Sequence, residues 1–209
     1  MHKILLLSSS ILIALFSFGT GSSKKAPAGT SAVPNLPNQF LDKVEITNIA
    51  WREYLYYQKN EYGADHKNYL TALPDTAIWR QSYDVPFFKP GNYDNWPVVG
   101  VSYEQAVAYA KWRSMVVSTK EKRKVTYSLP SIKVYKLASA NSSSNKIAEG
   151  LYSTKIGFRN FLGLCENAAE MTNKEGEAVM GSERENCLDT FEYVVPKPNL
   201  GFRCMAVLN

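Results

Sequence analysis

The two halves of this 209-residue chain carry different hydrophobic patterns, and this contrast limits the folds available to it. Segments with helical periodicity lie in the N-terminal half and the centre. Roughly the last sixty residues hold only short apolar runs separated by Gly, Asn and Pro, which is typical of β-hairpins and loops. We therefore expect an α+β fold with low regular secondary structure and with its helices segregated toward the N-terminal half.

Capping residues locate the beginnings of two helices. Thr47 can cap a helix over residues 48–60, because its hydroxyl can accept a hydrogen bond from a free amide of the first turn. Ser102 and Gln105 have the spacing of a capping box, and apolar residues follow them directly. The capping box predicts a helix that runs to about residue 118.

Aromatic residues divide into two groups. Trp51 and Trp112 lie on the apolar faces of the two expected helices, which predicts that both are buried. Residues 64–96 combine several prolines with many aromatic residues, and we expect a long ordered loop there. Within that loop, Trp79 and Trp96 are the candidates for an exposed aromatic site.

The N-terminal residues have the pattern of an export signal. A short basic start and an apolar run are followed by small residues, so we expect a signal peptide over residues 1–21. Residues 22–38 are rich in Pro, Gly, Ser and Lys and predict a flexible leader, with one domain over residues 39–209. A lipid anchor is not expected because the first cysteine is Cys165, and no later segment is long and apolar enough to span a membrane. The protein is therefore expected in the periplasm or outside the cell.

Positive charge is mild and is concentrated in one place. The formal net charge is +5, and a basic cluster lies at residues 120–124. A solvated loop after a helix explains this cluster better than a nucleic-acid site, because exported proteins seldom meet nucleic acid. We expect no nucleic-acid partner.

Four stretches, in the right order, resemble the formylglycine-generating enzyme (sulfatase-modifying factor) family. The second stretch is the most specific, with a Pro-Val pair, a β run and a Ser-Tyr-Glu-Gln-Ala helix start. The fourth has two parts, similar to the family's Gly-Asn-Val-Trp-Glu-Trp-Thr signature and its closing Gly-Phe-Arg-Cys. The stretches are residues 44–48, 97–112, 129–138, and 166–172 with 199–204.

This resemblance implies the family's compact, loop-rich fold, which is related to C-type lectins. The aromatic segment 73–79 looks most like the members associated with gliding motility and type IX secretion. The resemblance also implies where catalytic members hold copper(I), namely on two cysteines shortly before the closing motif. Here the equivalent segment, 181–190, contains only Cys187, so this segment alone cannot supply two thiolates. The related iron sites need several histidines, and His66 is the only one beyond the expected signal peptide.

Three cysteines remain to be assigned in a chain expected to enter an oxidising compartment. Cys187 and Cys204 are the candidates for a disulfide, which leaves Cys165 as the candidate free thiol. Two alternatives stay open. One is a redox or copper site that uses Cys165 with another cysteine, and the other is a set of free, buried thiols.

Asn167 and Glu170 occupy positions at which the resemblance implies calcium binding in catalytic members. The alternative role for the same two residues is a hydrogen-bond network that closes a loop.

The resemblance and its departures favour a non-catalytic binding or assembly scaffold with protein partners in the cell envelope. A copper-dependent oxidase with a rearranged thiol site and a calcium-dependent glycan-binding module are the alternatives.

Overall fold

The computed structural model describes residues 25–83, 88–140, 161–164, 167–179 and 189–209. Their strands form two four-stranded sheets. The first sheet has the order β1-β2-β8-β3 and is antiparallel throughout, whereas the second has the order β6-β5-β4-β7 and joins β4 to β7 in parallel. The strands of the first sheet are β1 (Thr30–Ala32), β2 (Gln39–Asp42), β3 (Val125–Ser128) and β8 (Met205–Leu208). Those of the second are β4 (Ala169–Met171), β5 (Glu177–Val179), β6 (Thr190–Glu192) and β7 (Leu200–Gly201).

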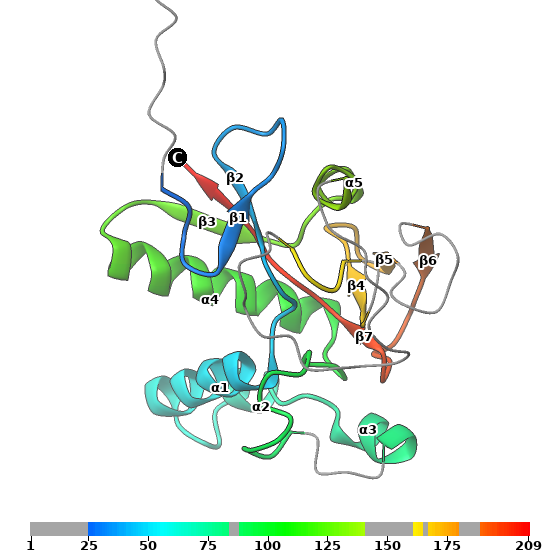
Figure 1. Ribbon diagram of the computed structural model, residues 1–209. Helices are drawn as coiled ribbons and strands as arrows, with labels where there is room; N and C mark the ends of the chain where they lie inside the picture. Colours follow the sequence, from blue (N-terminus) through cyan, green and yellow to red (C-terminus); the bar gives the residue numbers. More distant parts are fainter. Residues whose placement is uncertain (1–24, 84–87, 141–160, 165–166, 180–188) are drawn as a thin grey trace, which may run out of the picture.

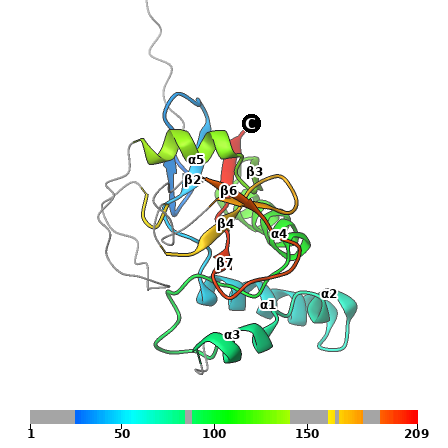
Figure 2. The same cartoon turned by 90° about the vertical axis from the view of Figure 1, so that its right-hand side faces the viewer.

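The described residues form five helices around these sheets. Figure 1 shows α1, α2 and α3 at one end of the molecule, α5 at the opposite end and α4 alongside the first sheet, and Figure 2 shows the same separation from the side. No helix within the described ranges is long and apolar enough to cross a bilayer. The helices are α1 (Asn48–Tyr62), α2 (Lys67–Leu70), α3 (Thr76–Tyr83), α4 (Tyr103–Glu121) and α5 (Ile132–Ser139).

Both predicted helix starts are confirmed. The Thr47 side chain accepts a hydrogen bond from the Ala50 amide at the start of α1. At the start of α4, the Ser102 hydroxyl accepts from the Gln105 amide, and the Gln105 side chain accepts from the Ser102 amide at 2.7 Å. The capping box satisfies two amides that the helix itself leaves without partners.

The larger core lies between α1, α4 and residues of both sheets. The rings of Trp51 and Tyr109 stack with their centroids 5.4 Å apart, and Phe202 meets both rings edge-on. Trp51 is fully buried as predicted, whereas Trp112 is only partly buried and packs against this core. Clusters of this kind bury large apolar area and hold the helices against the sheet.

Two expectations about loops are wrong. The leader predicted at residues 22–38 contributes β1, whose Thr30 is buried, because β2 offers an edge with which this segment can pair. The loop predicted at residues 64–96 contains α2 and the whole of α3, although α2 has only four residues. The expected signal peptide at residues 1–21 lies outside the described residues.

Candidate functional site

A buried ionic network joins the two sheets. Arg203, between β7 and β8, donates from Nε and Nη2 to the two carboxylate oxygens of Glu170 at 2.6 and 2.5 Å. It also donates to the backbone carbonyls of Asp42 and Leu162 at 3.1 and 2.9 Å. Paired bonds from one guanidinium to one carboxylate are among the strongest polar contacts in proteins. Arg203 and Glu170 are 0% and 1% exposed, so this pair is sealed from solvent.

A second carboxyl group lies within the same network. Asn167 Nδ2 donates to Glu45 Oε1 at 2.9 Å, while Glu45 Oε2 accepts no hydrogen bond from the described residues and lies 3.9 Å from Arg203 Nη2. Burial raises the pKa of Glu45 to about 8, against the opposing charge of Arg203, and the nearby Glu170 adds to the rise. At neutral pH Glu45 therefore holds its proton. The buried network then contains one cation, Arg203, and one anion, Glu170.

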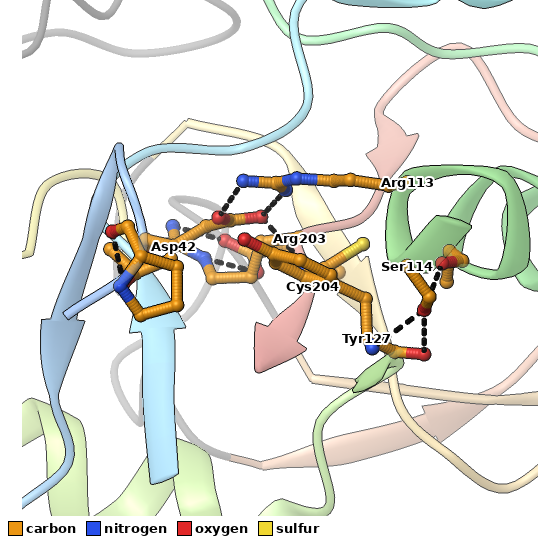
Figure 3. A network of polar contacts seen from close by, with 10 residues as sticks. Asp42, Arg113, Ser114, Tyr127, Arg203 and Cys204 are labelled. Atoms are coloured by element: carbon orange, nitrogen blue, oxygen red, sulfur yellow. Dashed lines mark hydrogen bonds and ion pairs between the residues drawn. The ribbon is translucent and has the colours of Figure 1, made fainter. Parts of the chain in front are cut away.

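Figure 3 shows an adjoining network around Asp42, the last residue of β2. Arg113 of α4 donates to both oxygens of Asp42, at 2.6 and 2.7 Å, and its guanidinium lies 4.3 Å from the centre of the Tyr127 ring. Asp42 Oδ2 also accepts from the backbone amide of Cys204 at 2.9 Å. The Ser114 hydroxyl accepts from the Tyr127 amide, which ties α4 to β3. This network therefore connects α4, β2, β3 and the start of β8.

The Cys204 side chain lies inside this network as a free, fully buried thiol. Burial raises its pKa well above the ordinary range, and the negative charge of Asp42 adds to the rise. Since the thiolate is the nucleophile and the metal ligand, a thiol in this setting is unreactive. Cys165 and Cys187 lie outside the described residues, and the proposed Cys187–Cys204 disulfide remains a prediction that the free Cys204 thiol does not support.

Asn167 and Glu170, the candidate calcium ligands, are both buried in the first network. Glu170 is held by Arg203, and Asn167 adopts a left-handed backbone conformation, with φ of 71°, next to Glu45. Among the described residues there is no group of three or more His, Cys, Asp or Glu side chains arranged to hold a metal ion. Their observed contacts are those of the alternative role, a hydrogen-bond network, and calcium binding remains a prediction.

The candidate aromatic site is corrected at Trp79. This residue is 2% exposed, its Nε1 donates to the Val99 carbonyl at 2.9 Å, and its ring packs against Phe88. Formation of α3 turns the ring inward against the segment that leads to α4. Trp96 is partly exposed, and its ring contacts Tyr93 edge-on. The two tryptophans therefore do not form one exposed surface.

An accessible concave surface among the described residues lies over the N-terminal end of α4. Two hollows of about 390 and 620 Å³ adjoin there and share Ser102, Glu104 and Pro196. We refer to them together as the α4 groove. Its further lining comes from the β4–β5 turn, including Glu175, and from the segment after β6, including Tyr193. Sequence reasoning missed this groove because its walls come from segments far apart in the chain.

The part that Glu45 and Arg203 play in the ionic networks was also missed, although both residues stand within the stretches that resemble the family. Glu45 is flanked by Val44 and Ile46, and Arg203 follows Phe202. The sequence signal for these networks was a charged residue next to apolar residues, because a charge buried with such neighbours needs a buried partner. Its partner could not be named, since Arg203 and Glu45 are far apart in the sequence.

Comparison with known protein families identifies the family of this chain. The model of the sulfatase-modifying factor enzyme 1-like domain matches residues 7–191. The chain belongs to this family. Among solved structures, the sulfatase-modifying-factor-like chain matches the Treponema denticola variable protein 1 at 12% identity and a TM-score of 0.49, over 88% of this chain and 92% of that one. A search of curated proteins finds no match.

Proposed function

We propose that this sulfatase-modifying-factor-like chain is a non-catalytic binding or assembly domain. The observation that carries the proposal is that residues of the family motifs are buried and bonded to one another. Glu170 and Arg203 neutralise each other at 0–1% exposure, and the Cys204 thiol is buried beside Asp42. Groups placed in this way stabilise a fold, but a substrate cannot reach them.

The setting we propose is the cell envelope. The basic, apolar and then small-residue pattern at the N-terminus supports export, and the resemblance of residues 73–79 supports a link to secretion or gliding motility. Fractionation of producing cells tests this part of the proposal. We expect the protein in the periplasm or the medium with its N-terminal segment removed, and an intact chain in the cytosol would refute export.

The non-catalytic character is tested with the purified, folded protein. We would incubate it with copper(I) and a cysteine-containing peptide and follow the peptide by mass spectrometry. The expected result is an unchanged peptide, as in a control without protein. Conversion of the peptide cysteine to formylglycine above that control would refute the proposal.

A thiol-labelling experiment tests the burial of Cys204 separately. A Cys165→Ser, Cys187→Ser double variant retains a single thiol, so the labelling of Cys204 can be read alone. We expect that thiol to react with an aromatic disulfide reagent only after denaturation. Rapid labelling of the folded variant would show that the thiol is accessible and would favour the copper-dependent alternative.

A further inference from the structure

The α4 groove is acidic, although the chain as a whole is basic. Its described lining residues include the carboxylates Glu104, Glu175 and Asp75 and no Lys, Arg or His, whereas the formal net charge of the chain is +5. The two nearest lysines in the sequence are engaged elsewhere. Lys174 pairs with Glu177 at 3.3 Å, and the Lys197 ammonium lies 5.0 Å from the centre of the Phe191 ring. The groove therefore presents negative charge that its own lining does not neutralise.

Two of these carboxylates are held close together. The Ser102 hydroxyl donates to Glu104 Oε2 at 2.7 Å and lowers the pKa of that carboxyl, so Glu104 is ionised at neutral pH. The Glu175 side chain lies within hydrogen-bonding reach of Glu104 and lowers the pKa of Glu104 further. A basic group placed against these two side chains would meet negative charge that the lining of the groove does not neutralise.

A second observation, independent of the carboxylates, supports ligand binding in the groove. Tyr193 lines the groove and is only 7% exposed, yet its buried hydroxyl has no hydrogen-bond partner among the described residues. A buried hydroxyl without a partner is costly, and native proteins rarely leave one. An ammonium or guanidinium group in the groove could donate to this oxygen while its charge faces Glu104 and Glu175.

The rim of the groove indicates that the cation belongs to a polypeptide. Val194 and Val195, next to Tyr193, are 97% and 60% exposed, and Leu73 on the other side of the groove is 41% exposed. An amine or a metal ion alone would leave these side chains in water. An extended peptide with apolar residues beside a basic one would cover them and gain from their burial.

We propose that the α4 groove binds a segment of a partner protein that carries a lysine or arginine flanked by apolar residues. The basic side chain lies against Glu104 and Glu175, within reach of the Tyr193 hydroxyl. The flanking residues pack on Val194 and Val195. This inference rests on the proposed binding function and names the chemistry of the partner.

The test uses the full exported chain and a defined probe. The probe is a fluorescent, end-blocked peptide in which valine and lysine alternate, and the control peptide has glutamine in place of lysine. We expect saturable binding of the lysine peptide in a fluorescence-anisotropy titration, with affinity that falls as salt increases. Failure of the lysine peptide to bind, or equal binding of the glutamine peptide, would overturn the proposal.

Variants locate the binding within the groove. Glu104→Gln combined with Glu175→Gln should weaken binding by about tenfold or more, because two charge-assisted contacts are lost. Tyr193→Phe should weaken it less and without changing the dependence on salt. Glu61→Gln, an exposed acid of α1 outside the groove, is the matched control and should bind as the unaltered protein does. Equal effects of the groove and control variants would show non-specific charge attraction and overturn the proposal.

The outcomes also separate this inference from the proposed function. A groove that binds neither peptide leaves the formylglycine result unaffected, so the chain would remain a binding domain with another surface in use. Conversion of a cysteine peptide would refute the non-catalytic proposal whether or not the lysine peptide binds. Binding of free spermidine as tightly as the lysine peptide would overturn the assignment to a polypeptide.

Discussion

Carboxylates occur in two contrasting settings in this molecule. In the buried networks, Glu170 and Asp42 each meet the fork of an arginine at 2.5–2.7 Å. In the α4 groove, Glu104 and Glu175 are exposed and face no basic residue of the described lining. The same chemical group therefore stabilises the fold in one place and remains available to a ligand in the other. Burial together with pairing makes the difference.

Removal of Arg203, the cation of the buried network, should produce the largest change in stability. It tests whether the buried carboxylates depend on their arginine partners. Arg203→Met leaves Glu170 buried without its cationic partner, and we expect a loss of about 3–5 kcal/mol in the free energy of unfolding. Lys174→Met, which removes an exposed pair with Glu177, should cost less than about 1 kcal/mol. Urea denaturation of both variants measures the difference, and similar losses would contradict the distinction between the two settings.

Titration of Glu45 should produce an intermediate effect. Its pKa in the folded protein, about 8, lies above the ordinary value of 4.5, so the folded protein retains a proton that the unfolded chain releases. The stability that this proton supplies is fully present below about pH 4.5 and is lost as the pH rises through 8. Each unit between the folded and unfolded pKa values is worth about 1.4 kcal/mol.

Glu45→Gln removes this titration and keeps an acceptor for Asn167. We expect the variant to be more stable than the unaltered protein at pH 9 and to lose the decline between pH 5 and pH 8. Thermal unfolding across this range measures both effects, with Glu61→Gln as the exposed control. A parallel decline in all three proteins would show that Glu45 is not the group responsible.

The smallest effect on stability is expected for the carboxylates of the groove. It tests whether Glu104 and Glu175 serve binding rather than the stability of the fold. Replacement of Glu104 and Glu175 by glutamine removes exposed charges, so the free energy of unfolding should change by less than about 0.5 kcal/mol. The expected change in peptide binding is much larger. Urea denaturation alongside the binding titration tests this separation, and a large loss of stability would assign the two carboxylates a structural role.

Local sequence signals were sufficient for several parts of the fold. Thr47 and the Ser102–Gln105 capping box placed the starts of α1 and α4, because each cap is satisfied within three residues of its own chain. The short C-terminal runs were correctly expected to form strands. The order of the four motifs also indicated the family, because a motif order is a property of the chain and needs no knowledge of its contacts.

Errors arose where a segment depends on a distant partner. Residues 30–32 resemble a flexible leader by composition, yet they form β1 because β2 lies beside them. Trp79 was a candidate for exposure, and α3 together with the Val99 carbonyl draws it inward. In both cases the local composition was judged correctly. The contact that decided the structure came from a segment elsewhere in the chain.

The sequence by itself determined the fold class, the principal helix caps and the family, since these depend on periodicity, short-range hydrogen bonds and motif order. Only the tertiary structure decided that Arg203 joins Glu170 to Glu45, and that Glu104, Glu175 and Tyr193 share a groove. The physical reason is that pairing and burial set the chemistry of a charged group. Both depend on which distant segments the fold brings together.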